Sequence, residues 1–181
     1  MRSWHAALKF VAAASLVAAF TVPGDLPDGV YALDYDPATG QAVSDFELLQ
    51  PSLTKRSMRI RPLEVRQAQK NPPPLEKPKT TCGNAELNRN DLEEAKGLFE
   101  SLCESDRMYP ARNAVIITQG RVIAYMCNYN ADNRCWSEEY AEASSILDKQ
   151  CGNRRSGTVY VDRWKKTYGR DVMGADICLE P

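Results

Sequence analysis

Histidine is almost absent from this sequence, and its absence excludes several kinds of chemistry. The only histidine, His5, lies within a segment that has the pattern of a secretory signal. The secreted part therefore has no imidazole, which excludes Ser-His-Asp and Cys-His hydrolases, histidine-dependent ribonucleases and histidine-ligated zinc. Cysteine is absent from residues 1–81, and no segment after residue 20 is apolar enough for a second membrane span.

The signal is predicted at residues 1–19. Arg2 and Lys9 supply positive charge before an apolar core that is shorter than the roughly 20 residues needed to span a bilayer. Cleavage is expected after Ala19 or, two residues later, after Thr21. We therefore predict a secreted, extracellular protein, with a membrane anchor as the alternative.

Charge divides the rest of the sequence into three blocks. Residues 20–56 carry a net charge of −4, residues 57–81 carry +4, and residues 82–181 carry −3. The first block has no cysteine and little to bury, so it should not fold stably alone, although it has room for one or two strands.

A dibasic pair, Lys55-Arg56, ends the first block and has the form of a secretory processing site. The proline-rich, basic segment that follows is of a type that stays extended and accessible to proteases. We predict a pro-segment at residues 20–56 and a linker at residues 57–81. The alternative is a disordered arm that is never removed.

Residues 82–181 form the cysteine-bearing domain. An even number of cysteines behind a secretory signal indicates a disulfide framework, here of Cys82, Cys103, Cys127, Cys135, Cys151 and Cys178. A zinc site is not expected, because there is no C-x₂-C pair, no histidine and an oxidising compartment. We expect neither a metal nor a cofactor.

Helical and β-branched segments alternate in this domain. Asn90 is expected to cap a helix that ends at Cys103, and Ser137 a second helix that ends at Cys151, with Gly152 as its stop. Strands are expected at residues 114–118, 121–127, 157–161 and 174–178, with a first strand at residues 79–83 or missing. This order predicts an α+β fold, a small disulfide-stapled sandwich of the split β-α-β type with two helices on one face of an antiparallel sheet.

The expected helix directions place the cysteines at two poles. Cys82, before the first helix, and Cys151, at the end of the second, share one pole and are the firmest pair. The other four cysteines lie at the opposite pole. We prefer Cys127 with Cys135 and Cys103 with Cys178, and Cys103 with Cys127 and Cys135 with Cys178 is nearly as good.

Two carboxylate pairs, Glu93-Glu94 and Glu138-Glu139, have the residue types for acid and base in glycoside cleavage. Both pairs fall in the first turn of an expected helix, where negative charge is favourable for the helix dipole. Ser144-Ser145 has no base to activate it. We therefore predict no catalytic residue and no enzyme.

A basic, aromatic stretch at residues 154–170 holds six of the thirteen positive residues of the domain. Cations beside aromatic rings can bind nucleic acid, anionic lipid or acidic polysaccharide, so an anionic ligand is a candidate partner. The domain's net charge of −3 argues against nucleic acid. The candidate surface is Arg163, Trp164, Lys165, Lys166, Tyr168 and Arg170. The alternatives are a solvated loop whose aromatic rings pack on the sheet, and a functional face on the opposite side, around residues 128–136.

The pattern of the domain resembles a known family. Its elements are the run Val122-Ile-Ala-Tyr-Met-Cys-Asn-Tyr129, a cysteine eight residues after Cys127, a helix ending in Cys151-Gly152, then residues 157–160 and Tyr168-Gly-Arg170. They resemble the necrosis-inducing-factor effectors of filamentous fungi and, at the level of the fold, killer-toxin-like proteins. Leu26-Pro-Asp-Gly-Val-Tyr31 is similar to part of such precursors.

The resemblance implies a secreted fungal effector or toxin-like virulence factor that acts on a plant host or a competing microbe by binding, without catalysis. Its partner would be an unidentified host or microbial surface target. One alternative is an antimicrobial killer protein that acts on membranes or channels, and another is an extracellular hydrolase that uses carboxylates. A pair of buried carboxylates in a cleft would favour the hydrolase, and membrane permeabilisation would favour the killer protein.

Overall fold

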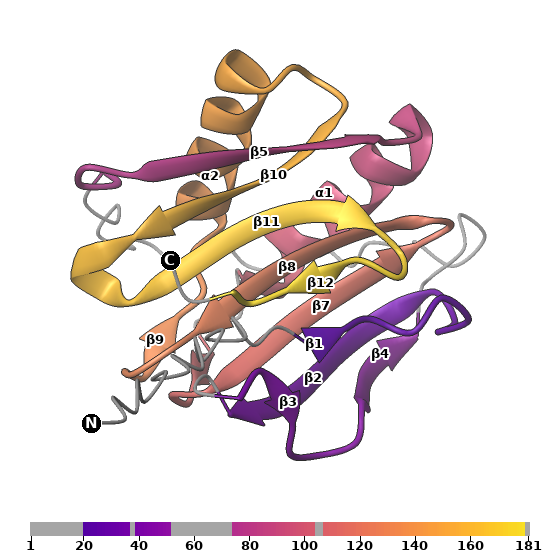
Figure 1. Cartoon of the computed structure of the whole chain (residues 1–181), viewed down its shortest axis with the longest axis vertical. Coiled ribbons are helices and arrows are strands. Elements are labelled where there is room, and N and C mark those ends of the chain that lie inside the picture. Colours follow the sequence, from indigo (N-terminus) through magenta and orange to yellow (C-terminus); the bar gives the residue numbers. More distant parts are fainter. Residues whose placement is uncertain (1–19, 37–38, 52–73, 104–106, 180–181) are drawn as a thin grey trace, which may run out of the picture.

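The computed structural model describes residues 20–36, 39–51, 74–103 and 107–179. The predicted signal at residues 1–19, the dibasic pair Lys55-Arg56 and most of the predicted linker lie outside these residues. Most of the strands form one antiparallel sheet (Figure 1). In spatial order its strands are β3 (Gln41–Ala42), β2 (Gly29–Asp36), β7 (Asn113–Gln119), β8 (Val122–Asn128), β11 (Lys166–Val172), β10 (Arg155–Val161) and β5 (Lys79–Glu86), and β4 (Glu47–Pro51) also pairs with β2.

Both helices, α1 (Arg89–Cys103) and α2 (Ser137–Gln150), lie on one face of this sheet. Each helix buries residues at three- and four-residue spacing, and the rings of Phe99 and Tyr140 stack between them with centroids 4.1 Å apart. Against them pack β7 and β8, which are buried along nearly their whole length, as expected of central strands covered on both faces. The predicted α+β, disulfide-stapled architecture is confirmed.

The other face of the sheet is covered by a smaller layer. The strand β1 (Phe20–Thr21) pairs with β12 (Asp176–Ile177), and these two strands lie in front of the sheet in Figure 1. Between the two layers is a second apolar cluster that includes Leu33, Ile116, Tyr125 and Tyr129. Each face of the sheet therefore has its own core.

Residues 20–51 are part of this structure and not a separate block. The strand β2 pairs with β7 from Gly29, opposite Thr118, to Asp34, opposite Asn113. Its side chains contribute to both cores, because successive residues of a strand point to opposite faces. The sequence suggested that this block has little to bury, but β2 buries Val30, Leu33 and Tyr35 against the cysteine-bearing domain.

Several local boundaries differ from the sequence prediction. The carbonyl oxygen of the Asn88 side chain accepts the backbone N–H groups of Asn90 and Asp91, so Asn88 caps α1 in place of Asn90. Ser137 is the first residue of α2, which has no side-chain cap hydrogen bond. The strand β11 was not predicted at all. The first strand of the domain, left open in the sequence, is present as β5.

The three disulfides link Cys82 with Cys151, Cys103 with Cys135, and Cys127 with Cys178. The first pair is confirmed. Both predicted arrangements of the other four cysteines are wrong, because these pairs are sorted by the faces of the sheet. Cys103 and Cys135 belong to the core under the helices, whereas Cys127 and Cys178 belong to the core on the opposite face.

Candidate functional site

The structure divides the predicted basic surface between the exterior and the interior. Arg163 and Trp164 lie in the short helical turn η1 (Asp162–Trp164), and Lys165 follows it. The side chains of Arg163 and Lys165 are 63% and 44% exposed. By contrast Lys166, Tyr168 and Arg170 are at most 2% exposed, since they alternate along β11 and point toward the helices. These three residues are therefore not surface residues, and the predicted set is wrong in that respect.

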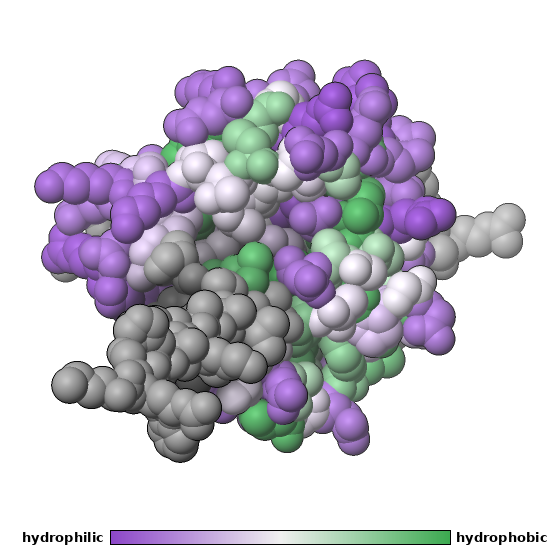
Figure 2. Space-filling view, viewed as in Figure 1, coloured by the Kyte–Doolittle hydropathy of each residue, from purple (hydrophilic) through white to green (hydrophobic). Residues whose placement is uncertain are grey.

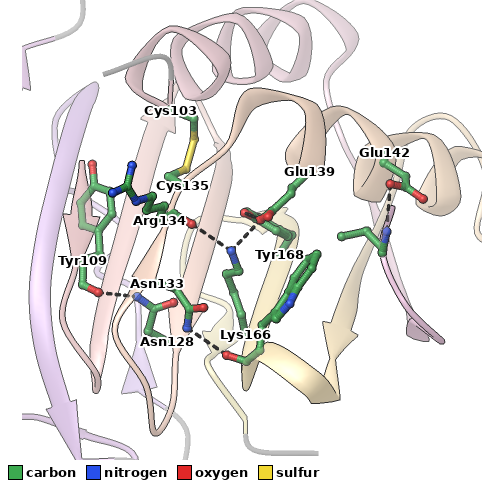
Figure 3. Close-up of polar contacts among 12 residues, drawn as sticks. Cys103, Tyr109, Asn128, Asn133, Arg134, Cys135, Glu139, Glu142, Lys166 and Tyr168 are labelled. Atoms are coloured by element: carbon green, nitrogen blue, oxygen red, sulfur yellow. Dashed lines mark hydrogen bonds and ion pairs between the residues drawn. A yellow bond between two sulfur atoms is a disulfide. The ribbon is translucent and has the colours of Figure 1, made fainter. Parts of the chain in front are cut away.

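Lys166 is the centre of a buried polar network (Figure 3). Its Nζ donates to Glu139 Oε2 at 2.6 Å and to the backbone oxygen of Arg134 at 2.9 Å, and the Tyr168 hydroxyl donates to the same Glu139 oxygen at 2.6 Å. Burial lowers the pKa of Lys166, although the nearby carboxylate acts in the other direction. Burial also raises the pKa of Tyr168 well above its ordinary value. The network ties α2 and the segment before it to the middle of the sheet.

Arg170 has a similar structural role at the other end of α2. Its guanidinium donates to the backbone oxygens of Arg155 and Gly152 and, at 2.6 Å, to Asp148 Oδ1. The carbonyl of Gly152 lies just beyond the helix, where a positive charge interacts favourably with the helix dipole. Arg170 thus holds the end of α2 against the sheet.

The exposed part of the predicted surface has an unexpected neighbour. A two-stranded sheet of β6 (Met108–Tyr109) and β9 (Asn133–Arg134) lies beside η1, because Asn133 Nδ2 donates to the backbone oxygen of Trp164 at 2.9 Å. The backbone N–H of Tyr129 likewise donates to the oxygen of Lys165. The region around residues 128–136, expected on the opposite side, is therefore adjacent to η1. We call residues 107–109, 133–136 and 162–165 together the loop end.

Cations and aromatic rings are paired at the loop end. The guanidinium of Arg107 lies over the ring of Tyr109 at 5.5 Å, and that of Arg134 lies over Trp136 at 6.0 Å. On the buried side of the loop end, the Nζ of Lys166 lies 5.2 Å from the centroid of the Trp164 ring. Such contacts favour one orientation of each ring. The half-buried Trp136 and Trp164 are thus fixed with part of their surface open.

Two cations of the loop end already have acidic neighbours. Arg163 pairs with Glu76, and Lys165 Nζ lies 2.7 Å from Asp162. The hydrogen bond between Lys165 and Asp162 raises the pKa of the lysine and lowers that of the aspartate. Exposed pairs of this kind are weak, so an anionic group of a partner is able to compete for the cations.

A concave feature lies on the face opposite the helices. A cavity of about 240 Å³ is bounded by β5, β10, β11 and the C-terminal segment from Asp176 to Leu179. Its floor includes Thr81, Thr158 and Thr167, and the first two are direct partners across the strands β5 and β10. In Figure 2 the surface over these strands is pale, the colour of intermediate hydropathy. Asp171 also lines the cavity, and burial raises its pKa. This cavity is not predictable from the elements expected in the sequence, because β11 is not among them.

The carboxylate pairs considered for catalysis are not brought together as an acid and a base. Glu93 and Glu138 are exposed, and Glu139 is engaged with Lys166 and Tyr168. Ser144 is buried on α2 with no hydrogen-bond partner for its hydroxyl within the described structure. Among the described residues, no cluster of three or more acidic, cysteine or histidine side chains is placed to hold a metal ion.

No family model matches this sequence, and no curated protein or solved structure is significantly similar to it. The molecule is an α+β protein stapled by three disulfides, which fits an oxidising, extracellular compartment. Within the described ranges, no helix combines the length and the apolar character needed to cross a membrane.

Proposed function

We propose that this protein is a secreted fungal effector or toxin-like virulence factor that binds a surface target of a plant host or a competing microbe, without catalysis. The observation that carries the proposal is the construction of the loop end. Its cations are exposed, its two tryptophan rings have part of their surface open, and both are mounted on a rigid support. A surface ordered before binding loses less conformational entropy when it meets its partner.

The support comes from three separate contacts. The disulfide of Cys103 and Cys135 joins the end of α1 to the residue next to Trp136, as Figure 3 shows. Lys166 holds the backbone of Arg134, and Asn133 holds the backbone of Trp164. Together these contacts fix the backbone just before Trp136 and at Trp164.

The chemistry of the loop end favours a partner with anionic groups beside apolar or ring-shaped surface. Tryptophan and arginine are enriched among residues that dominate binding energy at interfaces. The absence of a large positive excess still argues against nucleic acid as the partner. The engagement of Glu139 with Lys166 supports a binding function over a carboxylate hydrolase, because this carboxylate is already neutralised.

The test is a comparison of two double charge reversals in the oxidised protein. Arg163→Glu with Lys165→Glu changes the loop end, and Arg121→Glu with Lys149→Glu makes the same change of charge at exposed positions away from it. We expect the first variant to lose binding to host or microbial cell surfaces, and cell death after infiltration into plant tissue, while the second keeps both. The binding should also weaken with salt, since screening shortens the range of these charges.

Equal binding and activity of the two variants would reject the loop end as the contact surface. Equal activity of the oxidised and the reduced wild-type protein would reject an effect that depends on the fold. Leakage of microbial cells exposed to the protein would favour a membrane-active killer protein, and release of sugars from cell walls would favour a hydrolase.

A further inference from the structure

The N-terminal strands are joined to the rest of the molecule in a different way from every other element. Residues 20–51 contain no cysteine, whereas the part from β5 onward is tied by all three disulfides. Their one covalent connection is the chain at residues 52–78. That connection contains the dibasic pair Lys55-Arg56.

The non-covalent attachment of these strands is extensive. The backbone of β2 is paired with β7 over six consecutive residues, and Phe20 is paired with Ile177 of β12. Side chains add further bonds, from Tyr35 to the backbone oxygen of Asn128 at 2.9 Å and from Thr118 to that of Pro27 at 2.6 Å. These bonds reach both ends of β2.

The attachment also completes both cores. Val30 of β2 belongs to the core under the helices, and Leu33 and Tyr35 belong to the core on the other face; all three are at most 2% exposed. Departure of β2 would bring this apolar surface into water and leave β7 as an unpaired edge. Because β7 is buried along most of its length, such an edge would be strongly apolar.

We propose that residues 20–51 are a separable strand subunit, which stays bound when the chain is cut between β4 and β5. A dibasic-specific endoprotease would hydrolyse the bond between the carbonyl carbon of Arg56 and the nitrogen of Ser57. One water is consumed, and a carboxylate and an amine result. The product is then a two-chain protein, in which the chain of residues 20–56 stays bound through its strands β1 to β4 and is not discarded as a pro-segment. This inference is independent of the proposed function.

The first experiment cuts the oxidised protein with a dibasic-specific protease and compares native size-exclusion chromatography with denaturing mass analysis. We expect the two chains to elute together, one to one, in native buffer at micromolar concentration and to separate only in denaturant. The Arg56→Ala protein is the uncut control. Co-expression of residues 20–56 and 57–181 as separate chains repeats the test without a protease. Recovery of the larger chain alone and folded, in either format, would overturn the proposal.

A second experiment asks whether β2 carries the attachment. Leu33→Ala removes a buried side chain of β2, and Val43→Ala is the matched control, because Val43 is 66% exposed in the same segment. After the cut, we expect the N-terminal chain of Leu33→Ala to dissociate about tenfold faster or more, and that of Val43→Ala to behave as wild type.

Exchange between cut wild-type proteins keeps the proposal testable if Leu33→Ala fails to fold. An isotope-labelled N-terminal chain is mixed with unlabelled complex, and its incorporation is followed by native mass spectrometry. Slow exchange without loss of either chain supports a separable subunit. Complete exchange of the labelled for the unlabelled chain within the mixing time contradicts it, as would equal dissociation of the two variants.

Discussion

The Nζ of Lys166 lies 2.6 Å from Oε2 of Glu139, and the side chains of both residues are at most 5% exposed. A charge taken out of water in this way is unfavourable unless its partner is present. The attraction between the two charges is therefore expected mainly to offset the cost of burying them. We also expect the pair to specify how α2 is placed on the sheet.

Substitution at Lys166 tests this compensation. Lys166→Met leaves the Glu139 carboxylate buried without a cation and should lower the free energy of unfolding by about 3–5 kcal/mol. Adding Glu139→Gln should recover a large part of the loss, because the amide is neutral and its oxygen still accepts from Tyr168. Lys165→Met, at the exposed neighbouring position, is the control and should leave stability essentially unchanged. Urea unfolding measures all three, and a loss as large in the double variant as in Lys166→Met would contradict the argument.

Alkaline pH should destabilise the fold through its buried tyrosines. Burial raises the pKa of Tyr125, Tyr140 and Tyr168 in the folded state, so above about pH 10 the unfolded chain loses phenol protons that the folded chain keeps. Stability should then fall by up to about 1.4 kcal/mol per tyrosine for each pH unit. The lowered pKa of Lys166 has the opposite effect, so that stability rises with pH, but this is one group and the three tyrosines outweigh it. Urea unfolding at pH 8 and pH 11 measures the effect, and equal stability at the two values would show that the rings are solvated.

Disulfide mapping should find three bridges and no free thiol in the unreduced, denatured protein. Each bridge closes a long loop, so replacing both cysteines of a pair by alanine should cost about 3–4 kcal/mol for Cys103 with Cys135 and somewhat more for Cys82 with Cys151. The comparison uses urea unfolding of the two double variants. A peptide that joins Cys127 to Cys135 would disprove the assignment of bridges to the two faces of the sheet.

Two glycines should respond to alanine in opposite directions. A Cβ atom at Gly169 would lie 2.3 Å from the buried Tyr125 ring, which would have to shift, so Gly169→Ala should cost about 1–3 kcal/mol. Gly97 is exposed within α1, and a Cβ there meets nothing within 4 Å. Gly97→Ala should therefore stabilise by roughly 0.5–1 kcal/mol. The difference in melting temperature between the two variants is the measurement, and a shift of the same sign in both would contradict the packing described for Tyr125.

Much of the secondary structure is predictable from the sequence because it depends on local pattern. The apolar spacing from Leu92 to Cys103 indicates α1, and the β-branched runs around Gly120 indicate β7 and β8. The pairing of Cys82 with Cys151 follows from the positions of two helix ends. The prediction of these features does not require knowing which face of a strand is covered by the helices.

The remainder depends on long-range contacts that the sequence does not display. In β11 the positions that face the helices are Lys166, Tyr168 and Arg170, and two of these are charged, so residue types that normally mark a solvent face here lie in the interior. Their acidic partners, Glu139 and Asp148, lie on a different element. The alternation of side chains along β8 shows that Cys127 and Met126 face opposite sides of the sheet. It does not show which of these two sides the helices cover. The wrong cysteine pairs and the misplaced binding residues follow from this.

The pairing of β1 with β12 also bears on where the predicted signal is removed. Cleavage after Ala19 would make Phe20 the first residue of the mature protein, with its ring packed near Tyr35 and its backbone paired with Ile177. Cleavage after Thr21 would instead delete the whole of β1 and a ring that is 5% exposed. The choice between two peptide bonds two residues apart thus decides whether the outer layer of the sheet is complete.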